Sequence, residues 1–152
     1  MGKIQELMES DHRRCDELLA EAERAVERAD VEAAAAAFGR FRQATLDHFA
    51  GEEKILFPAF EDRSGMRFGP TEIMRQEHTQ MRDLMTSAAQ ALALNDLDAY
   101  CVEMEMLVIL MQQHNMKEEN ILYPMCDRHF AGDTGPMLAT LESAIAGDKV
   151  IA

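Results

Sequence analysis

A pattern of histidine and glutamate occurs twice in this chain, and its two copies lie 66 residues apart. Each copy has two histidines separated by 36 positions, with a glutamate four positions after the second histidine. The six residues are His12, His48, Glu52, His78, His114 and Glu118. The match continues beyond the glutamates without a gap, as far as Pro58 and Pro124. Because a fixed offset indicates a duplicated structural unit, we predict one domain over residues 1–152, built from two repeats at about 4–62 and 70–128.

The residues between these positions favour helices. Only four prolines and eight glycines occur among 152 residues, and aromatic residues make up 6%, which is typical of an all-α protein. Apolar residues recur at steps of three and four. They predict long helices over about 3–29, from after a turn at Asp30 to about 61, over 71–94 and over 97–128, and a short helix over 137–146. Long helices joined by short turns predict an up-down-up-down four-helix bundle with a short C-terminal helix.

All six residues of the pattern lie on the predicted inner faces of these helices. Residues four positions apart share one helix face, so each second histidine and its glutamate point to the same place. Continued at helical spacing, the inner faces beyond the glutamates are predicted to contain Ile55, Ala59, Ile121 and Met125.

A core with four imidazoles and two carboxylates requires compensating charge. No lysine or arginine lies on the inner faces, and an unpaired buried carboxylate costs on the order of several kcal/mol. Divalent cations would remove this cost. Six ligands exceed the needs of one ion, since carboxylates bridge, so we predict two ions that share both glutamates. One ion would bind His12 and His48, and the other His78 and His114. Nitrogen and oxygen ligands without thiolate suit iron or manganese, while zinc, nickel or copper would bind at least as tightly as ferrous iron.

The arrangement resembles the hemerythrin-like (HHE cation-binding) family over about residues 4–128. The residues that carry the resemblance are His12, His48-Phe-Ala-Gly-Glu52, His78 and His114-Asn-Met-Lys-Glu118. The resemblance implies a four-helix bundle around a non-haem diiron centre with bridging carboxylates.

The oxygen carriers of this family differ from the chain at one metal. They close one iron with an additional histidine in an HxxxH pair on the third helix, whereas this chain has Arg82 four positions after His78 and Met74 four positions before it. The acidic Glu77 directly before His78 is similar to the group that includes repair-of-iron-centres proteins. His129 lies beyond Pro124 and is predicted to be a surface histidine unless the fourth helix bends sharply.

Charge and cysteine content limit the partners and the compartment. A net charge of −13 argues against nucleic acid and against anionic membrane surfaces, and no apolar run is long enough to span a bilayer. Cys15, Cys101 and Cys126 form no CxxC pair, which favours a reducing compartment and a cytoplasmic protein. Cys15, one turn from His12, is interpreted either as a small buried residue or as a thiol that responds to chemistry at the metals.

Three functions fit these features. The favoured one is a diiron module that binds or senses a small ligand, namely O₂, NO or peroxide, with an electron donor as a possible partner. The second is an iron-delivery or iron-centre repair protein, or an enzyme that reduces peroxide or NO. The third is a passive bundle stabilised by zinc or another ion. Whether the protein is an enzyme stays open, with a non-enzymatic role preferred.

Overall fold

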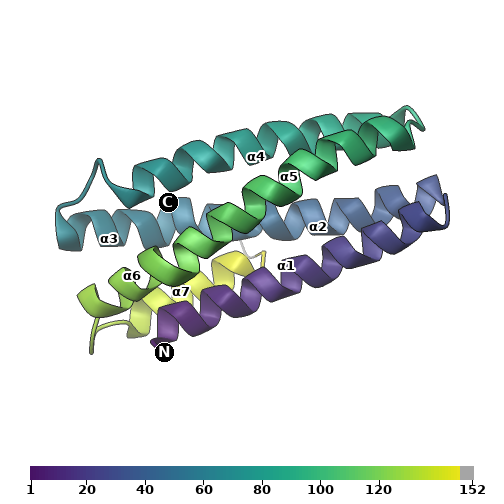
Figure 1. Cartoon of the computed structure of the whole chain (residues 1–152). Helices are drawn as coiled ribbons and strands as arrows, with labels where there is room; N and C mark the ends of the chain where they lie inside the picture. Colours follow the sequence, from purple (N-terminus) through teal and green to yellow (C-terminus); the bar gives the residue numbers. More distant parts are fainter. Residues whose placement is uncertain (148–152) are drawn as a thin grey trace.

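The computed structural model describes residues 1–147, and these form helices joined by short connections (Figure 1). In chain order the helices are α1 (Lys3–Glu27), α2 (Val31–Gly51), the π-helix η1 (Glu52–Leu56), α3 (Phe57–Ser64), α4 (Pro70–Ala93), α5 (Leu97–Lys117), the π-helix η2 (Glu118–Leu122), α6 (Tyr123–His129) and α7 (Gly135–Ile145). Because α2, η1 and α3 form one continuous rod, as do α5, η2 and α6, the described chain has four long rods and the short α7. The predicted four-helix bundle is confirmed.

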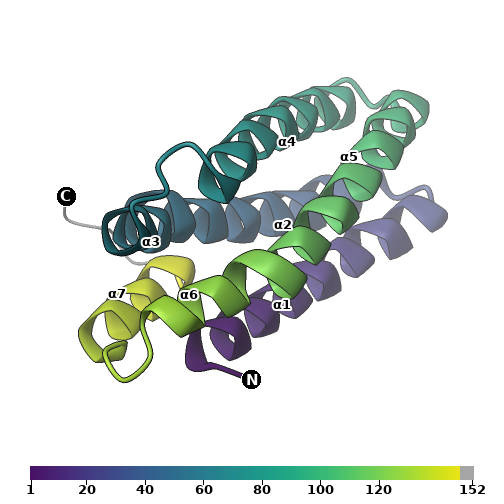
Figure 2. The ribbon, with the colours of Figure 1, turned by 60° about the vertical axis from the view of Figure 1, so that its left-hand side comes forward.

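The rods pair as two hairpins, α1 against α2 and α4 against α5 (Figure 2). The two hairpin turns are built alike. The Asp30 carboxylate caps α2 by accepting a hydrogen bond from the Ala33 amide at 3.0 Å, and the Asp96 carboxylate caps α5 through the Ala99 amide at 3.0 Å. Such caps satisfy backbone donors that the first helical turn leaves free. No helix within residues 1–147 has the length and apolar character that crossing a membrane requires.

The second and fourth rods each contain a π-helix that begins at a glutamate of the repeated pattern. The π-helix η1 begins at Glu52 and η2 begins at Glu118. A π-helical turn inserts one extra residue into an α-helix and is frequent at functional sites. The insertion shifts every later side chain by one position. The predicted inner residues after the glutamates were therefore wrong: the residues buried there are Leu56, Phe60, Leu122 and Cys126, in place of Ile55, Ala59, Ile121 and Met125.

Pro58 and Pro124 follow directly after the last hydrogen bond of each π-helix. Proline has no N–H, so the next carbonyl in the series loses its backbone donor. Side chains replace that donor: the carbonyl of Glu53 accepts from Arg75 at 3.4 Å, and the carbonyl of Glu119 accepts from Gln5 at 2.8 Å.

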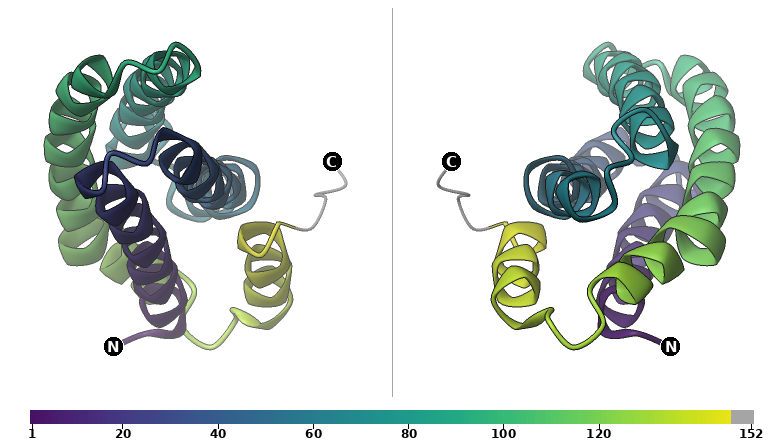
Figure 3. Two further views of the ribbon diagram at one scale, coloured as in Figure 1. Left: turned by 90° about the vertical axis from the view of Figure 1, so that its right-hand side faces the viewer. Right: turned by 90° about the vertical axis from the view of Figure 1, so that its left-hand side faces the viewer.

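Two apolar clusters lie at either end of the bundle and leave a polar layer between them. The cluster near the hairpin turns contains Phe38, Phe41 and Met85, and the other contains residues of α3, α6 and α7. Helix α7 lies beside α2 (Figure 3). Its approach depends on Gly51, because a Cβ there would lie 2.8 Å from the Ile145 Cγ2.

Candidate metal centre

The six residues of the repeated pattern, here called the central residues, meet in the polar layer. They come from all four rods, and none is more than 5% exposed. Helical spacing brings each second histidine beside its glutamate. The glutamate that follows it in the π-helix contacts a histidine of another rod: Glu53 contacts His78, and Glu119 contacts His12.

Each central carboxylate lies between one imidazole of the first repeat and one of the second. A single oxygen atom of each glutamate is close to both imidazoles. The distances are 3.1 Å from Glu52 Oε1 to His78 Nε2, 3.6 Å from Glu52 Oε1 to His48 Nε2, 3.2 Å from Glu118 Oε1 to His12 Nε2, and 3.3 Å from Glu118 Oε1 to His114 Nε2.

Each of the four imidazoles has a second carboxylate behind it, and these four residues are here called the outer carboxylates. They contact Nδ1, the nitrogen that faces away from the centre. The pairs are His12 with Glu119 at 2.7 Å, His48 with Asp11 at 2.7 Å, His78 with Glu53 at 2.6 Å, and His114 with Glu77 at 2.9 Å. Because a carboxylate accepts, Nδ1 is the donor, and the neutral imidazole presents a lone pair at Nε2 to the centre.

Several atoms at the centre have no hydrogen-bond partner among the described residues. They are Glu52 Oε1, Glu118 Oε2, His78 Nε2 and His114 Nε2. Lone pairs of nitrogen and carboxylate oxygen repel each other unless a proton or a cation lies between them. Two groups of donor atoms, each within 4.8 Å of one another, are compatible with a metal ion. They are Glu52, His78, His114 and Glu118, and His12, His48 and Glu118.

A family comparison agrees with this geometry. The model described as the hemerythrin HHE cation binding domain matches residues 3–126. The chain belongs to the hemerythrin HHE family. No curated protein and no solved structure matches the chain. The resemblance predicted from the central residues is therefore confirmed, and the histidine and glutamate clusters of this hemerythrin-like domain are compatible with metal binding.

Protons compete with cations for this site. Burial by itself would lower the pKa of His12, but hydrogen bonds to Glu118 and Glu119 outweigh it and raise that pKa to about 10. Burial likewise opposes protonation of His78, yet the adjacent carboxylates of Glu52 and Glu53 raise its pKa to about 9. Metal binding to the hemerythrin-like centre must therefore release protons.

Tyr123 is a central group that the sequence analysis missed. Its hydroxyl is 2.8 Å from a Glu52 oxygen and 2.9 Å from a Glu118 oxygen, and its single proton is shared between these two acceptors. The same hydroxyl lies 3.3 Å from His12 Nε2 and 3.2 Å from His48 Nε2. Burial and the two carboxylates hold the pKa of Tyr123 well above its usual value, so the phenol keeps its proton. Only the π-helical shift brings this residue inside.

Three of the four outer carboxylates are paired with basic side chains. The pairs are Asp11 with Arg14 at 2.8 Å, Glu53 with both terminal nitrogens of Arg82 at 2.8 and 2.9 Å, and Glu77 with Lys117. Glu119 has no such partner in the part of the chain that the structure describes. Arg82, at one of the two positions considered for the carriers' additional histidine, contacts Glu53. Asp11 and Glu53 were also missed, although their counterparts 66 residues on, Glu77 and Glu119, preserve the carboxylates.

His129 and Cys15, which the sequence analysis also considered, lie outside the two groups of donor atoms. His129 is partly exposed, and its ring packs edge-on against Phe60 with centroids 5.4 Å apart. Cys15 is buried, and burial together with the negative Asp11 raises its pKa to about 12. A thiol that stays protonated fits the interpretation of Cys15 as a small core residue better than that of a reactive group.

A groove between α1 and α5 reaches the edge of the centre. It has a volume of about 420 Å³, and its lining includes Leu19, Met111, Asn115 and Glu119. Glu119 is the same residue that binds His12 Nδ1. This Glu119 groove therefore brings solvent to within one side chain of a central imidazole.

Proposed function

We propose that this hemerythrin-like protein is a non-haem diiron protein that binds or senses O₂, NO or peroxide at a carboxylate-bridged centre. One observation carries the proposal: four imidazoles, fixed by outer carboxylates, aim their Nε2 lone pairs at two buried glutamates. That arrangement is costly without cations between the groups and favourable with them.

The proposed ligand set follows the two donor groups. His12 and His48 would hold one iron and His78 and His114 the other. Glu118 belongs to both donor groups, and Glu52 would be shared as well because its Oε1 also lies 3.6 Å from His48 Nε2. Donors of nitrogen and oxygen without thiolate favour iron over softer thiolate-bound ions. When bound, the iron pair would supply redox chemistry and open positions for a small ligand. The outer carboxylates orient the imidazoles and raise their basicity, and Tyr123 holds a proton at the shared carboxylates.

A coordination position left open on each proposed iron distinguishes this proposal from reversible oxygen carriage. Arg82 is engaged with Glu53 by two hydrogen bonds, so no third histidine closes the position of His78 and His114. The Glu119 groove offers a path for a diatomic molecule. We expect the reduced protein to be oxidised quickly by O₂ and to need an electron donor for its return. A cytoplasmic location is part of the proposal, supported by three unpaired thiols.

Anaerobic iron loading followed by metal analysis tests the centre directly. We expect two ions per chain, spectra that change on adding O₂, NO or peroxide, and a lower Tm after chelation. An ion at a thousandfold its dissociation constant stabilises the fold by about 4 kcal/mol. His78→Ala is expected to lose metal, whereas His129→Ala, a histidine outside the centre, keeps both ions. Binding of a single ion at most would contradict the dinuclear proposal, and release of intact O₂ under vacuum would identify a carrier.

Iron delivery, with a role in repairing iron centres, is a second candidate because the two ends of the centre differ in access. Glu119 is 34% exposed, borders the groove and lacks a basic partner among the described residues. Its hydrogen bond to His12 is therefore the outer contact most open to water. This function predicts that a chelator removes one iron much faster than the other. Equal rates would argue against delivery while leaving the diiron proposal intact.

A further inference from the structure

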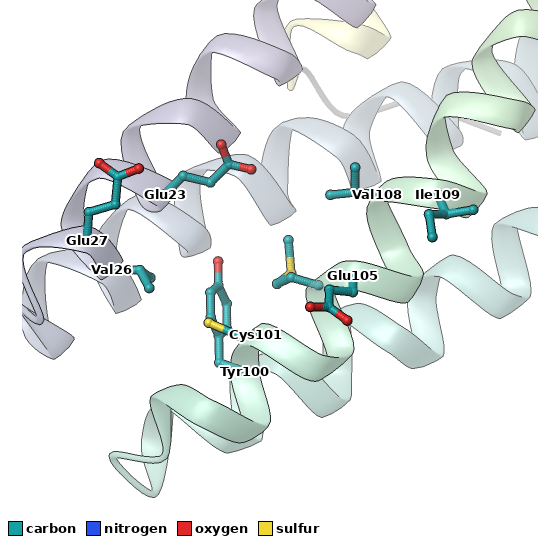
Figure 4. Close-up of a pocket in the computed structure, with 9 residues that line it drawn as sticks. Glu23, Val26, Glu27, Tyr100, Cys101, Glu105, Val108 and Ile109 are labelled. Atoms are coloured by element: carbon teal, nitrogen blue, oxygen red, sulfur yellow. The ribbon is translucent and has the colours of Figure 1, made fainter.

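A second groove lies between α1 and α5, nearer the hairpin turns (Figure 4). Its volume is about 560 Å³, within the range of small-molecule sites. Val26, Met104 and Val108 contribute apolar walls. Tyr100 also lines it, and we call it the Tyr100 groove.

The hydroxyl of Tyr100 is buried without a partner. Tyr100 is 2% exposed, and its ring packs edge-on against Phe38 at 5.5 Å. Its hydroxyl has no hydrogen-bond partner among residues 1–147 and points from α5 toward α1 in Figure 4. An unsatisfied buried hydroxyl is destabilising, so packing alone would favour phenylalanine here. The hydroxyl could therefore form a hydrogen bond with a ligand in the groove.

The charge of the groove selects the sign of that ligand. Glu23 and Glu27 of α1 and Glu105 of α5 all line the groove. Within the described residues, no lysine, arginine or histidine lines it. An anion would be repelled, and a neutral molecule would gain no attraction from the carboxylates. An ammonium group compensates them and donates a hydrogen bond to the phenolic oxygen.

We propose that the Tyr100 groove binds a primary amine with an apolar body, an alkylammonium or arylalkylammonium ion. The ammonium group lies between Glu23 and Tyr100. Its hydrocarbon body lies against Val26, Met104 and Val108, where Met104 is flexible enough to let the head reach the covered hydroxyl. The site is separate from the metal centre, because Tyr100 precedes His114 by 14 residues, about 20 Å along the helix.

Calorimetric titration of the metal-loaded protein with n-hexylammonium tests the site. Three matched compounds separate its parts: 1-hexanol has the tail without charge, hexanoate has the tail with the opposite charge, and methylammonium has the charge without the tail. We expect saturable binding of hexylammonium, weaker binding of 1-hexanol and methylammonium, and none of hexanoate. Equal binding of hexylammonium and 1-hexanol, or no binding of hexylammonium, would overturn the proposal.

Two variants separate recognition from folding. Tyr100→Phe is expected to weaken hexylammonium binding about tenfold, the usual effect of losing a hydrogen bond to a charged group, with Tm unchanged or higher. Glu23→Gln should weaken it similarly, whereas Glu17→Gln, an exposed residue of the same helix outside the groove, should not. If Tyr100→Phe and Glu23→Gln both bind hexylammonium as the parent does, the proposal is wrong.

Alkylation of Cys101 can show whether the amine binds in the Tyr100 groove. It lines the groove and is exposed, while Cys15 and Cys126 are buried. Iodoacetamide should therefore alkylate Cys101 first, and hexylammonium should slow that reaction in the parent protein but much less in Glu23→Gln. Unchanged alkylation at saturating hexylammonium would place the amine elsewhere and overturn the assignment.

Discussion

The two repeats place their histidines alike but surround them differently. Beside His12 and His48 lies the hydroxyl of Tyr123. The residue 66 positions earlier is Phe57, which has no hydroxyl and packs against His78 with ring centroids 5.8 Å apart. The helix register thus repeats the donor positions, whereas single substitutions around them make the surroundings of the two histidine pairs unequal.

The outer carboxylates show the same contrast. Glu53, behind His78, is held by Arg82. Its counterpart Glu119 has the acidic Asp16 nearby in place of a base. Burial raises the pKa of Asp16, and the negative charge of Glu119 raises it further. One position is therefore enclosed and charge-compensated, and the other is more polar and borders the Glu119 groove. Two histidine pairs in the same helix register can therefore have different electrostatic surroundings.

The largest effect is expected from removing a shared carboxylate. Glu52→Ala or Glu118→Ala should abolish binding at both positions, because each glutamate lies between imidazoles of the two repeats. His12→Ala should lose mainly one ion. Metal content after anaerobic loading measures the difference, and complete loss from all three variants would leave the shared role without support.

Substitutions of Tyr123 and Phe57 test whether these aromatic residues make the two proposed metal positions different. Tyr123→Phe gives the second repeat the residue of the first, and the affinities of the two positions for Co²⁺ should then converge, with a change of about tenfold for the lost hydrogen bonds. The reciprocal Phe57→Tyr adds a hydroxyl at a fully buried position and should lower stability by about 1–3 kcal/mol. Unchanged stepwise titration in Tyr123→Phe would show that the phenol does not distinguish the positions.

The response to pH should reverse with metal content. The folded-state pKa values of His12 and His78, about 10 and about 9, lie above the usual value near 6.5. The chelated protein should therefore keep this stabilisation below about pH 6.5 and lose it as pH rises toward 10. The metal-loaded protein should instead lose its ions on acidification. Urea unfolding across this range, with and without chelator, checks both trends.

The smallest effect concerns the hairpin turns. Ala29 and its counterpart Asn95 both adopt a left-handed backbone, with φ of 54° and 56°. Asparagine tolerates this conformation better than alanine. Ala29→Asn should therefore stabilise the protein by about 0.5–1 kcal/mol, and Asn95→Ala should destabilise it by a similar amount. A stability change of the opposite sign for either variant, measured by urea unfolding, would contradict this reading of the turns.

Local pattern was a reliable guide up to the glutamates and failed just beyond them. Helical spacing correctly placed His48 and Glu52 on one inner face. It then predicted Ile55 and Ile121 inside, where the π-helices bring Leu56 and Leu122. A single inserted residue leaves no compositional mark, because the same letters satisfy either register.

The amino-acid sequence by itself determined the rods and pointed to the six residues that meet in the polar layer, since helical periodicity and residue spacing are properties of neighbouring positions. That these six bind two ions stays a prediction, as does the division into two repeats of one domain. Only the tertiary structure decided which carboxylate stands behind which histidine. The partners Glu119 and His12 are 107 residues apart, and Tyr123 reaches Glu52 across 71. Such contacts depend on how four rods pack against one another, and no local spacing encodes that packing.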